Sequence, residues 1–269
     1  MLSSIVGVLG RHCGASAILS PTMLLYLIRH AESERNAGVP GSPIDCALTA
    51  IGQRQAAAVG QRVAELGVDW VLSSPYVRTL ETAEAVRRAT GAPGAVVPLL
   101  HEHHVEAFPQ TEDWPLLSRA ALTERYPHFR LPEDFAADSE WHDQPETDQG
   151  VLRRAKGVLA ALWERYALAP GGEPPQGQSP GGQPRDGKQD VRLAVVSHGS
   201  PTGKLLMATL RLESPSGIEF RIDNASLSIV EYWPDWRVVE AINRVDHLAH
   251  ISSAAELRKG DPGYAPRRP

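Results

Sequence analysis

Short apolar runs alternate with segments of helical hydrophobic spacing along most of the chain. Strands are predicted at 24–28, 68–72, 95–100 and 192–196, and amphipathic helices at 49–67, 75–90, 147–168 and 201–212. Near the end, SLSIVEYW and WRVVEAI are typical of two antiparallel strands joined at Pro234-Asp235. Buried strands that alternate with helices favour a parallel sheet covered on both sides. We therefore predict an α/β fold, a three-layer sandwich with a mostly parallel central sheet and helices on both faces.

One long segment interrupts this alternation, between the strand at 95–100 and the helix at 147–168. It spans about 103–146 and contains six aromatic residues, which are Phe108, Trp114, Tyr126, Phe129, Phe135 and Trp141. We predict a small helical cap insertion that packs on the sheet. Such a cap can also act as a lid whose side chains select the organic part of a substrate.

Three segments are predicted to lie outside the fold. Glycine and proline together make up 45 of 269 residues, about 17% against a usual ~12%. Residues 170–190 hold 6 Gly and 5 Pro and few apolar side chains, which predicts a flexible loop. Residues 1–22 lack the basic start of a signal peptide, so we expect a dispensable N-terminal extension before Met23 rather than a cleaved signal. The predicted domain is 23–257, and 258–269 is expected to be a disordered tail.

Charge and cysteine content narrow the class of protein. The formal net charge is −5, which gives no basic footprint for nucleic acid. No apolar run reaches 18 residues, so no membrane-spanning helix is expected. The two cysteines, Cys13 and Cys46, form no disulfide framework, and a cytoplasmic location is the simplest interpretation. Nothing in the pattern specifies an oligomeric state.

Charged side chains follow the predicted parallel strands at the point where each strand ends. Arg29 and His30 follow the first strand, Arg78 lies one helical turn beyond the second, Glu102 follows the third, and His198 follows the fourth. In parallel sheets the ligand site lies beyond the carboxyl ends of the strands. We expect these five side chains to converge there.

This set of side chains suits phosphoryl transfer. Arginine forks match phosphate oxygens and carry permanent charge. A neutral imidazole can attack phosphorus, a second, protonated imidazole can bind the oxygens that gain charge, and a carboxylic acid can protonate the departing alkoxide. Ser74 and Pro75 are predicted as N-cap and first residue of the next helix, whose N-terminus would then face the anion.

Five sequence blocks resemble motifs of the histidine phosphatase superfamily, in its phosphoglycerate-mutase-like branch. The blocks are LIRHAESERN at 27–36, SSPYVRTLETA at 73–83, LHE at 100–102, Glu146-Thr147 with Arg154, and VVSHG at 195–199. They run in the family's order from about Leu24 to about Leu248. All of the blocks in order make a far more specific signal than a single Arg-His pair.

The resemblance implies a role for each matched residue. His30 would be the nucleophile, Arg29, Arg78 and His198 would hold the phosphate, and Glu102 would be the proton donor. Asn36 would assist, although an asparagine in such a loop is also a common turn residue. The further candidates for substrate contact are Ser42, Glu106, Arg154 and Gly199, of which Arg154 can equally be a solvated charge on a helix.

Two departures from the family pattern affect these assignments. Ala31 stands where the family usually has glycine, a change that restricts the backbone slightly. Glu102 is followed by His103-His104-Val105-Glu106, without the usual glycine and aromatic residues. Glu106 is therefore a second candidate for the acid.

Two other patterns bear on metal and nucleotide binding. His101, His103 and His104 have a spacing found in zinc sites, but no further ligand set follows in the order that a metallohydrolase needs. The run 199–204 resembles a P-loop but is one residue short and has Leu205 where Ser or Thr should bind magnesium. We therefore predict no metal and no cofactor.

The expected function is metal-independent hydrolysis of a small phosphomonoester through phospho-His30. A cofactor-dependent phosphoglycerate mutase is the first alternative, because it uses the same phosphohistidine. Mutases need extra basic groups to retain a bisphosphate, and 105–146 offers only Arg119, Arg125 and Arg130. A catalytically inactive phospho-ligand-binding module is the second alternative. The nature of the phosphomonoester is not specified by these residues.

Overall fold

The computed structural model describes residues 22–104, 116–135, 137, 145–168, 190–213, 217–233 and 235–252. Its strands are β1 (Met23–Arg29), β2 (Trp70–Ser73), β3 (Gly94–Val96), β4 (Phe129–Arg130), β5 (Val191–Ser197), β6 (Leu227–Tyr232) and β7 (Arg237–Arg244). Its helices are α1 (Ala50–Leu66), α2 (Val77–Thr90), α3 (Arg119–Arg125), α4 (Asp148–Leu162) and α5 (Gly199–Thr209). Shorter helical turns are η1 (Pro98–Leu100), η2 (Trp163–Ala167) and η4 (Asp246–Leu248).

All of these strands form one sheet in the order β4-β3-β2-β5-β1-β6-β7. The neighbours β4, β3, β2, β5 and β1 pair in parallel, and β6 pairs antiparallel with both β1 and β7. The parallel strands therefore end at a common edge. This confirms the mostly parallel central sheet and the final antiparallel pair that the sequence predicts.

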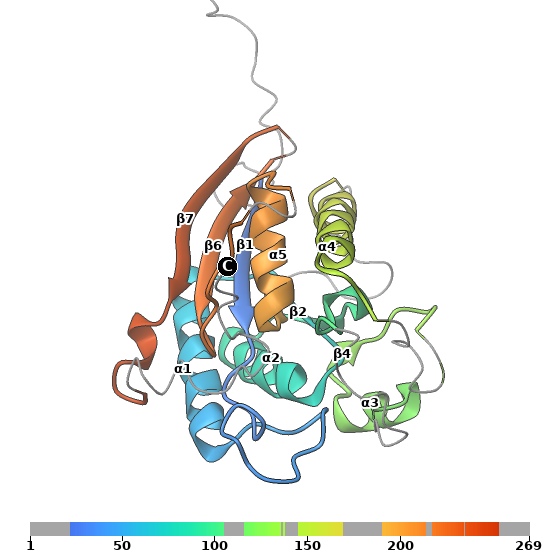
Figure 1. Ribbon diagram of the computed structural model, residues 1–269, viewed down its shortest axis with the longest axis vertical. Coiled ribbons are helices and arrows are strands. Elements are labelled where there is room, and N and C mark those ends of the chain that lie inside the picture. The colour runs from blue at the N-terminus through green and yellow to red at the C-terminus, as the bar shows by residue number, and fades with distance from the viewer. Residues whose placement is uncertain are drawn as a thin grey trace, which may run out of the picture.

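Helices cover both faces of the sheet (Figure 1). Successive side chains of β1 point to opposite faces, so Leu27 packs in one buried cluster with Leu159 of α4, while Ile28 packs in a second cluster with Val59 of α1 and Leu80 of α2. The three-layer prediction is confirmed. Among the described residues, no helix is both long enough and apolar enough to cross a bilayer.

Part of the predicted cap insertion joins the main sheet. β4 pairs in parallel with β3 at the sheet edge, and Leu122 of α3 and Phe129 of β4 are buried in the same cluster as α1 and α2. The sequence did not predict β4, because a strand of two residues shows no alternation. The predicted strand at 95–100 is also shorter than expected, since the chain turns into η1 at Pro98.

The predicted terminal and loop segments lie almost entirely outside the described residues. These segments are 1–22, 170–190 and 258–269, of which only residues 22 and 190 are described. Residues 105–115 of the insertion, including Glu106, also lie outside them.

The start of α1 is tied to the loop that follows β1. Thr49 caps the helix by accepting a hydrogen bond from the Gly52 amide, at 2.9 Å, and its hydroxyl donates to Glu32 Oε1 at 2.6 Å. A Cβ on Gly52 would lie 1.9 Å from the carbonyl oxygen of Glu32. Glycine is therefore required for α1 to approach the backbone two residues beyond His30.

The start of α2 differs from the prediction. The helix begins at Val77 with Tyr76 as N-cap residue, so Ser74 and Pro75 are not its cap and first residue. Its capping acceptor comes from another part of the chain, because Asp45 Oδ1 accepts the Val77 amide at 2.7 Å. Burial raises the pKa of Asp45 to about 6, although Arg78 and the Val77 amide both oppose this shift.

We expect Gly52→Ala to destabilise the protein by about 2 kcal/mol or more, because a backbone atom blocks the new methyl group. Gly157→Ala is the matched control, since Gly157 lies within α4 and a Cβ there meets nothing within 4 Å. The control should be neutral or more stable by up to ~1 kcal/mol. Urea unfolding of both variants measures the difference. Equal unfolding free energies would contradict the close approach.

The pH dependence of unfolding tests the burial of Asp45. Its folded-state pKa of about 6 lies above the reference 3.8, so the protonated form stabilises the fold and that stability is lost as pH rises from about 4 through 6. We expect wild type to lose on the order of 2 kcal/mol between pH 4 and pH 8 relative to Asp45→Asn, which stays uncharged. Asp134→Asn, at an exposed position, controls for removal of a charge. Parallel stability curves for wild type and Asp45→Asn would contradict the burial.

Candidate active site

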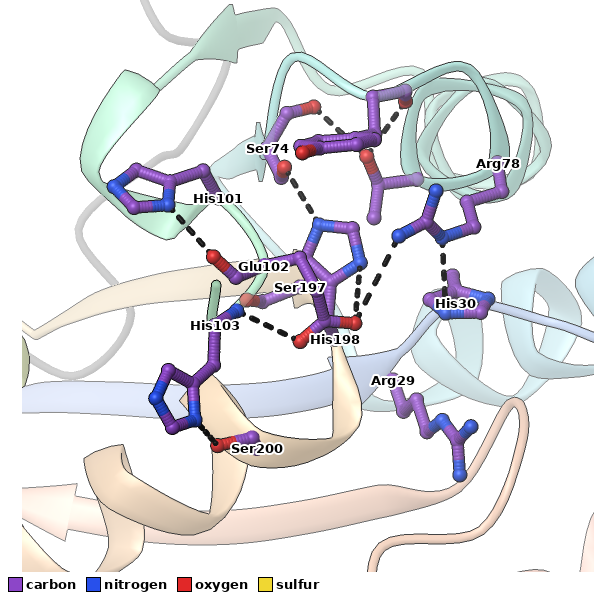
Figure 2. Close-up of polar contacts among 12 residues, drawn as sticks. Arg29, His30, Ser74, Arg78, His101, Glu102, His103, Ser197, His198 and Ser200 are labelled. Carbon is purple, nitrogen blue, oxygen red and sulfur yellow. Dashed lines mark hydrogen bonds and ion pairs between the residues drawn. The ribbon is translucent and has the colours of Figure 1, made fainter. Parts of the chain in front are cut away.

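The two site histidines are brought together by the pairing of β1 with β5. Arg29 is in register with Ser197, and the amide of His30 donates to the Ser197 carbonyl at 2.9 Å, which extends the ladder by one step. His30 and His198 therefore leave the same edge side by side, with ring centroids 5.3 Å apart. Figure 2 shows their rings beside Glu102 and Arg78, with Arg29 below them in this view.

His30 is held as a neutral imidazole with one defined tautomer. It is 3% exposed, and burial together with the charges of Arg78 and Arg29 holds its pKa well below the usual range. Its Nδ1 lies 2.8 Å from the carbonyl oxygen of Ala31, an acceptor that requires the proton on Nδ1. Nε2 therefore carries the lone pair, and Arg78 Nε donates toward it at 3.3 Å.

His198 is fully buried and lies between the Ser74 hydroxyl and Glu102. Burial, with Arg78 nearby, holds its pKa well below the usual range, so the protonated His198 expected from the sequence is not supported. Its Nε2 lies 2.9 Å from Ser74 Oγ. When that hydroxyl donates to Nε2, the proton of the neutral ring is on Nδ1, which lies 3.4 Å from Glu102 Oε2. His198 can thus offer one N–H donor to the site without a positive charge.

Glu102 lies in the loop after η1 and is partly exposed, so its carboxyl group can be reached from solvent. Its Oε2 is 3.7 Å from Arg78 Nη2, and its Oε1 accepts the amide of His103 at 2.9 Å. The carboxyl group thus lies beside Arg78 and His198, two side chains whose N–H groups can donate to an anion. The structure brings Glu102 to the place that the sequence predicted.

Both arginines are buried beside His30, and Arg78 is fixed by its neighbours. Arg78 is 7% exposed and its Nη1 donates to the Ile44 carbonyl at 2.9 Å. Arg29 is 6% exposed and its Nη1 donates to the Ile222 carbonyl at 2.6 Å. Two permanent positive charges among neutral imidazoles make this a site for an anion.

The backbone at His30 depends on a residue that the sequence pattern did not reveal. Asn224 Nδ2 donates both to the His30 carbonyl, at 3.1 Å, and to Asn36 Oδ1, at 3.0 Å. Asn36 Oδ1 also accepts from the amide and hydroxyl of Ser33. These three donors fix the orientation of the Asn36 amide. Asn36 therefore stabilises the turn at Ser33, and Asn224 links it to the backbone of His30.

Two other predicted contacts, Ser42 and Gly199, and the departure at Ala31 have different surroundings. Ser42 Oγ donates to the Val39 carbonyl within its own loop, at 2.7 Å. Gly199 begins α5 directly after His198, and 199–204 is helical rather than a phosphate-binding loop, with Lys204 Nζ 3.7 Å from Asp148. Ala31, the departure from glycine, is buried and lies outside the positive-φ region, so alanine fits there.

Arg154 supports the loop that carries Glu102. Its Nε and Nη2 form a fork with Glu146, at 2.9 and 2.5 Å, and its Nη1 donates to the carbonyls of Leu99 and His101, at 2.7 and 3.0 Å. This arrangement favours a positioning role for Arg154 over direct contact with substrate.

The three neighbouring histidines do not converge on one point. His101 Nδ1 lies 2.8 Å from the Glu102 carbonyl, His103 Nδ1 lies 3.2 Å from Ser200 Oγ, and His104 Nε2 lies 2.9 Å from the Tyr76 hydroxyl. Burial, with Arg154 nearby, lowers the pKa of His101 to about 3. The rings of His103 and His104 therefore tie the loop to two different segments, whereas His101 bonds within the loop.

A different trio could provide metal ligands. Within the described residues, His30, Glu102 and His198 each place one suitable atom within 4.8 Å of the others. The guanidinium groups of Arg29 and Arg78 lie beside the same atoms and disfavour a cation there. The donor set therefore fits a phosphoryl group better than a metal ion.

Comparison with known proteins identifies the chain's relatives. The chain is 30% identical over 241 residues to the probable phosphoglycerate mutase GpmB of Cronobacter sakazakii, covering 83% of this chain and 94% of that protein. The corresponding Escherichia fergusonii protein is 31% identical over 236 residues, with the same coverage.

Solved structures share the fold. A mycobacterial glucosyl-3-phosphoglycerate phosphatase has a TM-score of 0.54 and 21% identity, covering 82% of this chain and 99% of that chain. Phosphoserine phosphatase from Entamoeba histolytica has a TM-score of 0.53 and 19% identity, covering 84% of this chain and 99% of that chain. Residues 25–168, more than half of the chain, match the family profile of the histidine phosphatase superfamily (branch 1). This chain is therefore a member of the histidine phosphatase superfamily.

Proposed function

We propose that the protein is a phosphomonoester hydrolase that works through a phosphohistidine on His30. The observation that carries this proposal is the state of His30, a buried neutral imidazole whose Nε2 lone pair faces Arg78. A nucleophile for phosphorus needs that lone pair, and an anionic substrate needs the adjacent positive charge.

The first step transfers the phosphoryl group to the protein. His30 Nε2 attacks phosphorus while the bond from phosphorus to the ester oxygen breaks. Arg29 and Arg78 offset the charge on the phosphoryl oxygens, and His198 Nδ1–H donates a hydrogen bond to one of them. Glu102, in its protonated form, gives its proton to the departing oxygen.

The second step returns the enzyme to its starting state. Glu102, now a carboxylate, takes a proton from a water molecule that attacks phosphorus. The bond from phosphorus to His30 Nε2 breaks, and inorganic phosphate leaves. These residues supply the nucleophile, the acid and the positive charge themselves, so we propose that the reaction needs no metal or cofactor. We also propose that the substrate is a small phosphorylated molecule and that the reaction takes place in the cytoplasm.

A phosphoglycerate mutase activity is the second candidate, because the relatives in Cronobacter and Escherichia are named as such. The basic residues of the insertion favour the hydrolase. Arg119 donates to the carbonyls of Pro132, Glu133 and Phe135, and Arg125 pairs with Glu81. Arg130 lies over the Trp70 ring at 5.4 Å. All three arginines have structural partners, which leaves fewer charges to retain a bisphosphate.

Labelling of the protein tests the proposal. With ³²P-labelled phosphomonoester, wild type should form an acid-labile phosphoprotein that His30→Ala does not form. On a chase with 3-phosphoglycerate, the label should appear as inorganic phosphate, since water is the acceptor. Label that persists in His30→Ala would remove His30 as the nucleophile. Label that passes to 2-phosphoglycerate without release would instead support the mutase.

A further inference from the structure

A hydrogen bond joins the start of α2 to the loop that carries Glu102. The Tyr76 hydroxyl lies 2.9 Å from His104 Nε2, and Tyr76 is completely buried. His104 is two residues beyond Glu102, in the stretch 101–104, which is neither helix nor strand. His104 stands in the stretch after Glu102 that lacks the usual glycine and aromatic residues of the resemblance.

The Tyr76 ring also contacts two groups of the site. Its edge-to-face contact with His198 has a centroid distance of 5.0 Å and an interplanar angle of 81°. The guanidinium carbon of Arg78 lies 4.5 Å from the centre of the same ring, within the range of a cation–π interaction. One side chain therefore connects the phosphate-side residues to the loop of the acid.

The loop is held at its other side as well. His103 lies between Ser200 Oγ, at 3.2 Å, and the Glu146 carbonyl, at 3.0 Å. Ser197 Oγ donates to the Leu100 carbonyl at 2.8 Å, just before the loop begins. Tyr76 is therefore a further anchor of the loop around Glu102, and it ties His104 to the start of α2, the helix that carries Arg78.

Proton transfer depends strongly on this anchoring. A carboxylic acid must lie within hydrogen-bond reach of the departing oxygen, about 2.6–3.2 Å. A displacement of ~1 Å at such a group can cost up to ~100-fold in rate. Glu102 is partly exposed, so packing alone does not fix it. Its carboxyl group is held by Arg78, His198 and the His103 amide, and the backbone of the loop sets where that group starts from.

We propose that Tyr76 and His104 are positioning residues, whose hydrogen bond holds the 101–104 loop so that the Glu102 carboxyl group reaches the leaving-group oxygen. This inference rests on the hydrolase mechanism above, in which Glu102 is the acid. It gives the histidines after Glu102 a role in catalysis without a metal.

A positioning role for Tyr76 and His104 predicts that the rate depends on the basicity of the leaving group, which a purely structural role does not. The 4-nitrophenolate ion is a stable anion and departs with little help from an acid, whereas phenolate is more basic and needs a proton more. Phenyl phosphate and 4-nitrophenyl phosphate have nearly the same shape. A misplaced Glu102 should therefore slow phenyl phosphate more than 4-nitrophenyl phosphate.

The experiment compares kcat/KM on the two esters for Tyr76→Phe, which keeps the ring over Arg78, and for His104→Ala. Both variants should lose about 10-fold on phenyl phosphate and less than about 2-fold on 4-nitrophenyl phosphate, because only proton donation is impaired. His104→Gln, whose amide can donate to or accept from the Tyr76 hydroxyl near the position of Nε2, should recover most of the loss. Glu102→Gln sets the full size of the difference, and His250→Ala, at an exposed position, should match wild type on both esters.

The outcomes separate this inference from the proposed function. If Glu102→Gln shows the leaving-group dependence and Tyr76→Phe and His104→Ala do not, the positioning role is wrong while the mechanism stands. Equal losses on both esters in those two variants would also overturn it, because they indicate a lost fold or lost phosphate binding. If Glu102→Gln itself shows no dependence, or wild type hydrolyses neither ester, the proposed function fails and the inference fails with it.

Discussion

The parallel pairing of β1 with β5 is the constraint on which the rest of the site depends. These two strands lie at the centre of the sheet, and their ladder continues one step beyond β1, to the His30 amide. A slip of one residue would turn every side chain of a strand to the other face, so the buried clusters on both sides fix the register. That register decides that His30 and His198 emerge next to each other.

Burial then sets the chemistry of the paired histidines. In water an imidazole near neutral pH is a mixture of charged and neutral forms, but two buried arginines and the loss of solvent make the charged form unfavourable here. The positive charge of the site is thereby carried by groups that cannot act as nucleophiles. The same arrangement leaves His30 neutral, as the proposed nucleophile must be, and it provides an electrostatic reason for an anion to bind.

Much of this site is predictable from one rule applied to the sequence, that polar groups at the carboxyl ends of parallel strands share an edge. The rule found Arg29, His30, Arg78, Glu102 and His198, but it failed for Asn224. Asn224 precedes β6, and because β6 is antiparallel to β1, its beginning rather than its end lies at the site edge. A rule built on carboxyl ends therefore cannot find a residue at the amino end of an antiparallel strand.

Other features could not be derived from the sequence because they depend on contacts between distant segments. Asp45 caps α2 across 32 positions, whereas the local pattern pointed to Ser74. Ser74 is bonded to His198 instead. Likewise, nothing local distinguishes Arg154 on a helix from a solvated charge, and its fork with Glu146 becomes visible only in three dimensions.

The identity of the phosphorylated nitrogen tests the central claim most directly. The Ala31 carbonyl holds the proton on His30 Nδ1, so the phosphoryl group must go to Nε2. The measurement is ³¹P–¹⁵N NMR on the trapped phosphoprotein, prepared with histidine labelled at one ring nitrogen at a time. We predict coupling of phosphorus to Nε2 of His30 alone. Coupling to Nδ1, or to a different histidine, would contradict the arrangement of the site described above.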